Sequence, residues 1–288
     1  MNELRARVLP VAVVLLVLLA VWYVAAVLLN HDMAVALADD GDTGWQIWQS
    51  TLALDRPLLP APHQVLQEIV QSVFFQPLTS PRSLVFHAGV TALAAGCGFA
   101  VALVLGIAFA IGIAHLRVLD RSLMPWIIAS QTIPILAIAP MVIVVLGSLG
   151  VTGLLPKALI AGYLSFLPIT VAMVTGLRAA EPMQRDLMRT YSASGVQIFV
   201  KLRWPASMGF LFPALKVAAA LALTGAIVAE LPTGAAAGLG ARLLAGSYYG
   251  QTLQIWAALL AAALLAWAAT GGVELARVLL QQSRGGRL

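Results

Sequence analysis

Long uncharged runs alternate with short charged segments along the chain. The first run covers residues 8–29, and five more cover residues 83–114, 122–147, 158–177, 206–229 and a stretch within 243–273. A helix needs about 20 mostly apolar residues to cross a bilayer, and backbone groups in lipid must form their hydrogen bonds within the segment. The pattern therefore predicts an all-α integral membrane protein with about six transmembrane helices.

The composition agrees with a lipid-facing surface. Hydrophobic residues make up 61% of the 288 residues and charged residues only 10%, whereas a soluble domain carries about 25% charged residues. The net charge of +5 does not indicate nucleic-acid binding, because the basic residues stand at the ends of the apolar runs. The single cysteine, Cys97, excludes an internal disulfide.

The first apolar run predicts a membrane anchor helix over residues 1–30. Arg5 and Arg7 precede the run, and Ala36-Leu37-Ala38 after it has the small-residue pattern of a signal-peptidase site. A signal-peptide core is about 7–15 apolar residues long, and this run is longer. Because it is long enough to span a bilayer, we expect the segment to be retained.

The basic residues predict the orientation, because cytoplasmic loops are enriched in Lys and Arg. Most of the 17 basic residues are cytoplasmic when the N-terminus is placed there. Residues 31–82 then form an acidic external loop, in which apolar residues between Val65 and Val73 recur at helical spacing. Residues 83–281 form a core of five spans, and residues 282–288 form a cytoplasmic tail.

The connection over residues 178–205 is far longer than the roughly 2–8 residues that usually join packed helices. It is basic, and its apolar side chains recur at helical spacing from Leu187 to Leu202. Small residues at its centre offer a break, and Trp204-Pro205 is expected to end the helical part. Two interpretations remain open: a helix lying among lipid headgroups, or an element that docks in the groove of a partner.

The connection resembles the cytoplasmic loop of permease subunits of binding-protein-dependent ATP-binding cassette (ABC) importers. Their pattern is Glu-Ala-Ala, three residues, Gly, nine residues, Ile, one residue and Leu-Pro. The matching positions are Asp186, Leu187, Met188, Ser192, Leu202, Trp204 and Pro205. The resemblance implies a type I importer fold with coupling helices. It assigns ATPase coupling to Asp186, Leu187, Met188, Tyr191, Ser192, Gly195, Phe199, Leu202 and Pro205.

Other segments match the same family in the same order. They are Leu59-Pro60-Ala61-Pro62, Ile133-Pro134-Ile135 with Pro140, Phe166-Leu167-Pro168, and Ile227-Val228-Ala229-Glu230 followed by Gly238-Leu239-Gly240. The branch they resemble imports sulfonates, taurine, nitrate or thiamine-precursor pyrimidines, and the choice among these stays open. The resemblance covers about residues 60–280.

The resemblance also implies partners and a location. Two cytoplasmic ATPase subunits would bind ATP and Mg²⁺, and this chain would bind no cofactor itself. A second copy or a sister permease would complete the path through a bacterial inner membrane. A periplasmic solute-binding protein would deliver a small solute to it.

Polar residues inside the spans are candidates for the translocation path, because they are costly in lipid. They are Gln131, Thr132, Pro134, Lys216 and Glu230. Glu230 either lines the path or an outer gate, or it reaches interfacial water or pairs with Arg242. Lys216 either attracts an anionic substrate or extends toward the cytoplasm. Pro134 is expected to kink its helix.

The sequence points away from catalysis. It contains no nucleotide-binding loop of the type Gly-x-x-x-x-Gly-Lys-Ser/Thr, no metal-ligand spacing of cysteine and histidine, and no nucleophile with a base beside it. The main rival is an ion-coupled secondary transporter. That class often shows repeated halves and charged sites near mid-membrane, and this sequence shows no repeat and few such charges.

Overall fold

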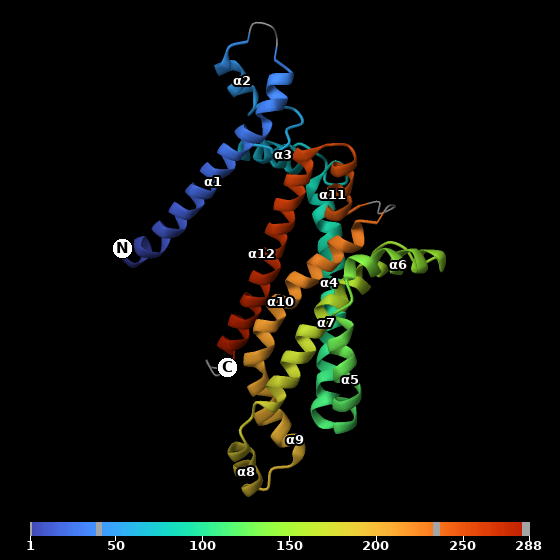
Figure 1. The fold of residues 1–288 in the computed structure, drawn as a ribbon. Coiled ribbons are helices and arrows are strands. Elements are labelled where there is room, and N and C mark those ends of the chain that lie inside the picture. Colours follow the sequence, from blue (N-terminus) through green and yellow to red (C-terminus); the bar gives the residue numbers. More distant parts are fainter. Residues whose placement is uncertain (1, 39–41, 233–236, 284–288) are drawn as a thin grey trace. The chain divides into compact units, whose positions relative to one another are not determined.

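The computed structural model describes residues 2–38, 42–232 and 237–283 (Figure 1). Within these ranges the regular structure is helical and no strand occurs, which confirms the all-α fold class. The chain divides into two compact units. One consists of residues 1–87 with 242–261, and the other consists of residues 88–241 with 262–288.

Five helices in the described part of the chain are long and apolar enough to cross a membrane. They are α1 (Asn2–Ala36), α4 (Leu84–His115), α7 (Leu154–Arg178), the continuous helix Gly195–Glu230, and α12 (Thr252–Ser283). Two shorter helices, α5 (Arg117–Ser130) and α6 (Ile135–Ser148), pass the same test together but are bent by 98° at a short break. If that bent pair is one span, the described residues contain the six that the sequence predicts.

In the first unit, a buried amide anchors the connection that follows α1. Asn30 is fully buried, and its side chain donates to the carbonyl oxygens of Thr51 (3.2 Å) and Leu59 (2.9 Å). The connection contains α2 (Gly44–Ser50) and leads into α3 (Pro62–Phe74). Because these carbonyl groups lie outside regular helices, a side chain satisfies them.

In the second unit, α7 and α10 (Trp204–Glu230) run side by side (Figure 1). Their backbones approach closely because small residues face each other. A Cβ added to Gly176 would stand 2.8 Å from Cα of Ser207, and one added to Gly225 would stand 2.8 Å from Cα of Ala161. Larger buried side chains fill the core beside this contact: Ile113, Ile169, Met173, Leu177, Leu211 and Phe212.

The expected helix end at Trp204-Pro205 is wrong. A π-helix, η1 (Phe199–Arg203), follows α9 (Gly195–Ile198) and continues directly into α10. Pro205 lies in the first turn of α10. In the continuous helix its missing N–H leaves one hydrogen bond unmade, directly after the wider π-turn. The second half of the connection is therefore helical and continuous with α10 rather than a loop before it.

The last span begins inside the expected range 243–273 and extends beyond its end, to Ser283. Leu243 belongs to α11 (Leu239–Tyr248), and α12 begins only at Thr252. Gly250, at φ +63°, lies in the turn between them, and this left-handed conformation interrupts a helix. The tail expected over residues 282–288 lies mostly outside the described residues.

Candidate functional site

The carboxylate of Glu230 lies at the end of α10 and is completely buried. It accepts hydrogen bonds from Thr91 Oγ1 of α4 (2.8 Å), Lys157 Nζ of α7 (3.2 Å) and the backbone N–H of Gly240 (3.0 Å). The Thr91 hydroxyl also accepts from the backbone N–H of Leu239 (2.9 Å). A buried charge is stable only when it is paired and hydrogen-bonded. Glu230 thus ties together α4, α7, α10 and the Gly-Leu-Gly segment.

The two glycines of this segment make room for the carboxylate. Gly238 has φ +129°, a conformation that residues with a Cβ rarely adopt, and a Cβ at this position would overlap the carboxyl group of Glu230. A Cβ on Gly240 would overlap the carbonyl oxygen of Ile227. The backbone can approach Glu230 this closely only because both residues are glycine.

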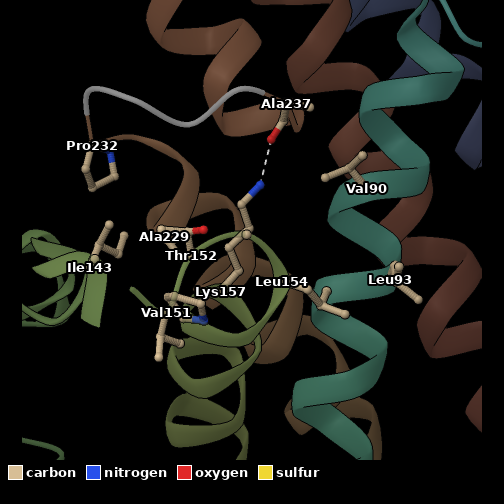
Figure 2. A pocket seen from close by; sticks show the side chains of 13 residues that line it. Val90, Leu93, Ile143, Val151, Thr152, Leu154, Lys157, Ala229, Pro232 and Ala237 are labelled. Carbon is tan, nitrogen blue, oxygen red and sulfur yellow. Dashed lines mark hydrogen bonds between the residues drawn. The ribbon is translucent and has the colours of Figure 1, made fainter. Parts of the chain in front are cut away.

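Beside this cluster is a pocket of about 550 Å³. Its walls come from α4, α6, the start of α7 and the end of α10, and Figure 2 shows Lys157 among mostly apolar side chains. Lys157 Nζ donates to the carbonyl oxygen of Ala237 (2.6 Å) as well as to Glu230, with which it forms an ion pair. The arrangement combines an apolar cavity with one ammonium group.

One of the alternatives for Glu230, a pair with Arg242, is wrong, because each residue has another partner. Glu230 pairs with Lys157, whereas Arg242 of α11 lies 3.8 Å from Glu68 of α3 and donates to the carbonyl of Arg82 (3.2 Å). Burial raises the pKa of Glu68, which Arg242 partly offsets, and burial lowers the pKa of Arg242.

Lys216 pairs with Glu274 of α12, with Nζ 2.6 Å from Oε2. Arg277 lies 3.6 Å from the other oxygen of the same carboxylate. The cation is therefore neutralised within the chain. Sequence reasoning missed this partner because the two residues are far apart along the chain.

The break between α5 and α6 contains the other predicted path residues. Pro134 is the N-cap residue of α6, and Gln131 donates to the carbonyl of Tyr163 (3.4 Å). The Thr132 hydroxyl donates to the carbonyl of Ala129 (2.8 Å). None of these three residues lines the pocket beside Lys157. The predicted kink is thus a break of 98°, and the structure does not bring these residues to Glu230.

Sequence reasoning missed Lys157 and Thr91 as members of the site. Lys157 precedes the apolar run 158–177, so the sequence alone indicates only an external basic residue. A usable signal was present, however, since Glu230 and Lys157 have opposite charges and both stand at expected span ends on the same side. Thr91 carries no such signal.

A second candidate site is the connection between α7 and α10. It consists of α8 (Pro182–Thr190), a turn, and α9 with η1. Ser192, in the turn, has φ +56° and is the only residue other than glycine with positive φ in the described chain. This is the position where the family pattern has glycine, the residue that adopts such a conformation most easily.

The predicted coupling residues divide into two groups. Asp186, Leu187, Tyr191, Ser192 and Gly195 are exposed, and Tyr191 has 79% of its surface accessible. The remaining four are partly buried: Met188, Phe199, Leu202 and Pro205. Exposed aromatic and aliphatic side chains at a turn are typical of a surface that a partner covers.

Arginine side chains fix the base of this connection. Arg203 donates through Nε to the carbonyl of Leu177 (2.8 Å) at the end of α7. Arg178 donates to the carbonyl of Ile113 (3.1 Å) and forms an ion pair with Asp120 (3.0 Å). These contacts satisfy carbonyl groups at helix ends. The connection is therefore attached to the end of α7, and the end of α7 is attached to α4 and α5.

The described residues offer no group of three His, Cys, Asp or Glu side chains that could hold a metal ion. The titratable groups of the Glu230 cluster are used in mutual pairing. What the arrangement can do chemically is bind and position a solute, and change shape if the ties of Glu230 are released.

Comparison with known proteins gives a consistent result. The family model described as "Binding-protein-dependent transport system inner membrane component" matches residues 102–284. The formylaminopyrimidine transport permease protein ThiX of Halalkalibacterium halodurans is 31% identical over 199 residues, which is 67% of this chain and 74% of ThiX.

Two further relatives have other solutes in their names. The riboflavin transport system permease protein RibX of Chloroflexus aurantiacus is 36% identical over 155 residues, 53% of this chain and 55% of RibX. The nitrate import permease protein NrtB of a Synechocystis species is 24% identical over 192 residues, 65% of this chain and 68% of NrtB.

Proposed function

Because this chain belongs to the family of binding-protein-dependent transport system inner membrane components, we propose that its connection between α7 and α10 receives mechanical work from an ATPase and transmits it to the Glu230 site. The chain is a multi-pass membrane permease of an ABC importer for a small solute. ATP hydrolysis belongs to a separate subunit in this proposal, and this chain binds no cofactor.

One observation carries the proposal. The helix Gly195–Glu230 is continuous, so its first residue belongs to the connection and its last residue is the buried carboxylate. At 1.5 Å per residue, a helix of 36 residues is about 54 Å long, which exceeds the thickness of a bilayer. A displacement of the connection is therefore transmitted along one continuous helix.

The family supports the following assembly as part of the proposal. Two ATPase subunits bind the exposed residues around Ser192 and Tyr191, and two permease chains, either identical or sister chains, enclose the path. A periplasmic binding protein delivers the solute. The termini face the cytoplasm of a bacterial inner membrane, since that orientation puts most basic loops inside. ATP binding then shifts the bundle between two states by favouring one of them.

The candidate solutes come from the relatives' names: a formylaminopyrimidine, riboflavin and nitrate. All are small, and the first two are heterocycles whereas the third is an inorganic anion.

Gly195→Trp tests the docking of the ATPase. A Cβ at Gly195, the first residue of α9, would meet nothing within 4 Å. The variant should therefore fold normally but lose co-purification with the ATPase and transport-coupled ATP hydrolysis. Gly44→Trp is the matched control, because Gly44 is the first residue of α2 and equally open. Full ATPase binding and coupling in Gly195→Trp would refute the proposal.

A further inference from the structure

The pocket beside Lys157 has mostly apolar walls. Val90 and Leu93 of α4, Ile143 of α6, Leu154 of α7 and Ala229 of α10 line it (Figure 2). Its volume of about 550 Å³ falls within the range of roughly 300–1,000 Å³ that is typical of small-molecule sites. An inorganic oxyanion would leave most of this volume unfilled.

The pocket carries no net charge. Among the described residues that line it, Lys157 alone is charged. The fully buried carboxylate of Glu230, with Oε1 3.2 Å from Lys157 Nζ, neutralises it. Pro232 and Ala237, which also line the pocket, carry no charge. An anion entering the pocket would lose its hydration, and the buried Glu230 carboxylate beside the ammonium group would cancel most of the attraction. One hydrogen bond from Lys157 would then offset only part of the cost of dehydration.

Lys157 nevertheless uses only two of its three hydrogen-bond donors on the described residues. An ammonium group has three N–H donors, and Glu230 and the Ala237 carbonyl accept two of them. The described residues provide no acceptor for the third. The Lys157 side chain keeps 12% of its surface accessible, and Nζ borders the pocket (Figure 2). A bound solute can accept this third hydrogen bond.

We infer that this pocket binds a neutral, largely apolar solute of about the size of a heterocyclic ring that accepts one hydrogen bond from Lys157, and that it discriminates against anions. The inference rests on the proposed function, since it treats the pocket as a binding site on the path of the transported solute. It separates solutes of the pyrimidine and flavin kind from nitrate and sulfonates.

A matched pair of probes tests the charge preference. Nicotinamide and nicotinate share one ring and nearly one size, but only nicotinate is an anion at neutral pH. Saturation-transfer NMR with the assembled importer in nanodiscs measures the binding of each. We expect nicotinamide to bind at least about tenfold more tightly, the ratio that corresponds to 1.4 kcal/mol. Equal binding of nicotinate, or no binding of nicotinamide, would overturn the inference.

Glu230→Gln changes the charge of the pocket without changing its shape. The amide oxygen can still accept from Thr91 and Gly240, but Lys157 becomes an unpaired cation. The preference should then reverse, so that nicotinate binds more tightly than nicotinamide. If nicotinamide keeps its full advantage in this variant, the Lys157–Glu230 pair does not set the charge preference and the inference fails.

A second variant gives a test that does not disturb the buried ion pair. Leu93→Trp on α4 places a large side chain at the wall, and Leu93 is exposed enough to tolerate it. It should abolish nicotinamide binding. Val104→Trp is the control, since Val104 is an exposed residue of the same helix and does not line the pocket. Retained binding in Leu93→Trp would place the probe elsewhere and contradict the inference.

The same preparations separate the two proposals. If the complex assembles and binding protein stimulates its ATP hydrolysis, but nicotinamide does not bind, the pocket inference fails and the proposed function stands. If no ATPase co-purifies, the proposed function fails, and the NMR measurement on the purified chain alone still shows whether the pocket prefers the neutral probe.

Discussion

Thr91 of α4 donates its hydroxyl hydrogen to Glu230 at the end of α10 over 2.8 Å, although 139 residues separate them. The same hydroxyl oxygen accepts the backbone N–H of Leu239. One side chain thus holds both the carboxylate and the segment that closes over it. This double role makes Thr91 a sensitive point of the site.

Thr91→Val should destabilise the chain by about 1–3 kcal/mol, because a buried carboxylate and a buried N–H each lose a partner. Denaturant or thermal unfolding in detergent measures the change. Thr175→Val is the control. Its hydroxyl is exposed and bonds only within its own helix, so the expected change is within about 0.5 kcal/mol. Equal stability of both variants would contradict the assigned role of Thr91.

Gly238→Ala should be much more disruptive than Gly250→Ala. Both glycines have positive φ, but a Cβ at Gly238 would overlap the Glu230 carboxyl group, whereas one at Gly250 meets nothing within 4 Å. The Gly250 variant should lose about 1–2 kcal/mol, the usual cost of a left-handed residue with a Cβ. The Gly238 variant should lose clearly more and should also impair transport. Unfolding curves of the two variants in the same detergent provide the comparison.

Ser192→Gly should keep or improve coupling, and Ser192→Val should impair it. Ser192 occupies a left-handed conformation, which glycine adopts freely and a β-branched residue avoids at a cost of about 1–3 kcal/mol. Hydrogen exchange of the α8–α9 turn reports the local effect, and transport-coupled ATP hydrolysis reports the functional one. A valine variant with normal exchange and coupling would show that the turn does not matter.

The stability of the first unit should fall as pH rises from about 4.5 toward neutrality. Burial raises the pKa of Glu68 in the folded chain, so the folded state holds this proton more tightly than the unfolded state. The contribution of Glu68 to the free energy of unfolding is therefore complete below its ordinary pKa and disappears as the pH rises through its raised pKa in the folded chain. Glu68→Gln should remove this part of the pH dependence. Unfolding of both proteins across pH 4.5–7 measures it, and identical profiles would contradict the shift.

The apolar runs were sufficient to predict the helical class and the long spans, because the cost of unpaired backbone groups in lipid leaves few alternatives. The break at Pro134 was visible as a kink, since proline acts locally. Its angle was not, because that depends on what α5 and α6 pack against.

The contacts of the site were harder to predict. The Gly-Leu-Gly segment was recognised as a motif. The need for glycine there arises from the close approach of its backbone to Glu230, a tertiary contact that the sequence does not show. The pairs Lys157–Glu230 and Lys216–Glu274 join residues more than 50 positions apart. By charge and by side of the membrane, both Lys157 and Arg242 could pair with Glu230. Arg242 is nearer along the chain, but the partner is Lys157. The helix through Pro205 was missed because a π-helix has no clear sequence signal.

The π-helix Phe199–Arg203 affects the rotational position of the connection about the axis of α10. A π-turn holds about one residue more than an α-turn, and one residue of α-helix corresponds to about 100° of rotation. Conversion of this stretch to regular α-helix would therefore rotate Gly195 and the residues before it by roughly a quarter revolution about the axis of α10. The helix itself would stay continuous. The π-turn therefore determines the direction in which the connection projects from the axis of α10.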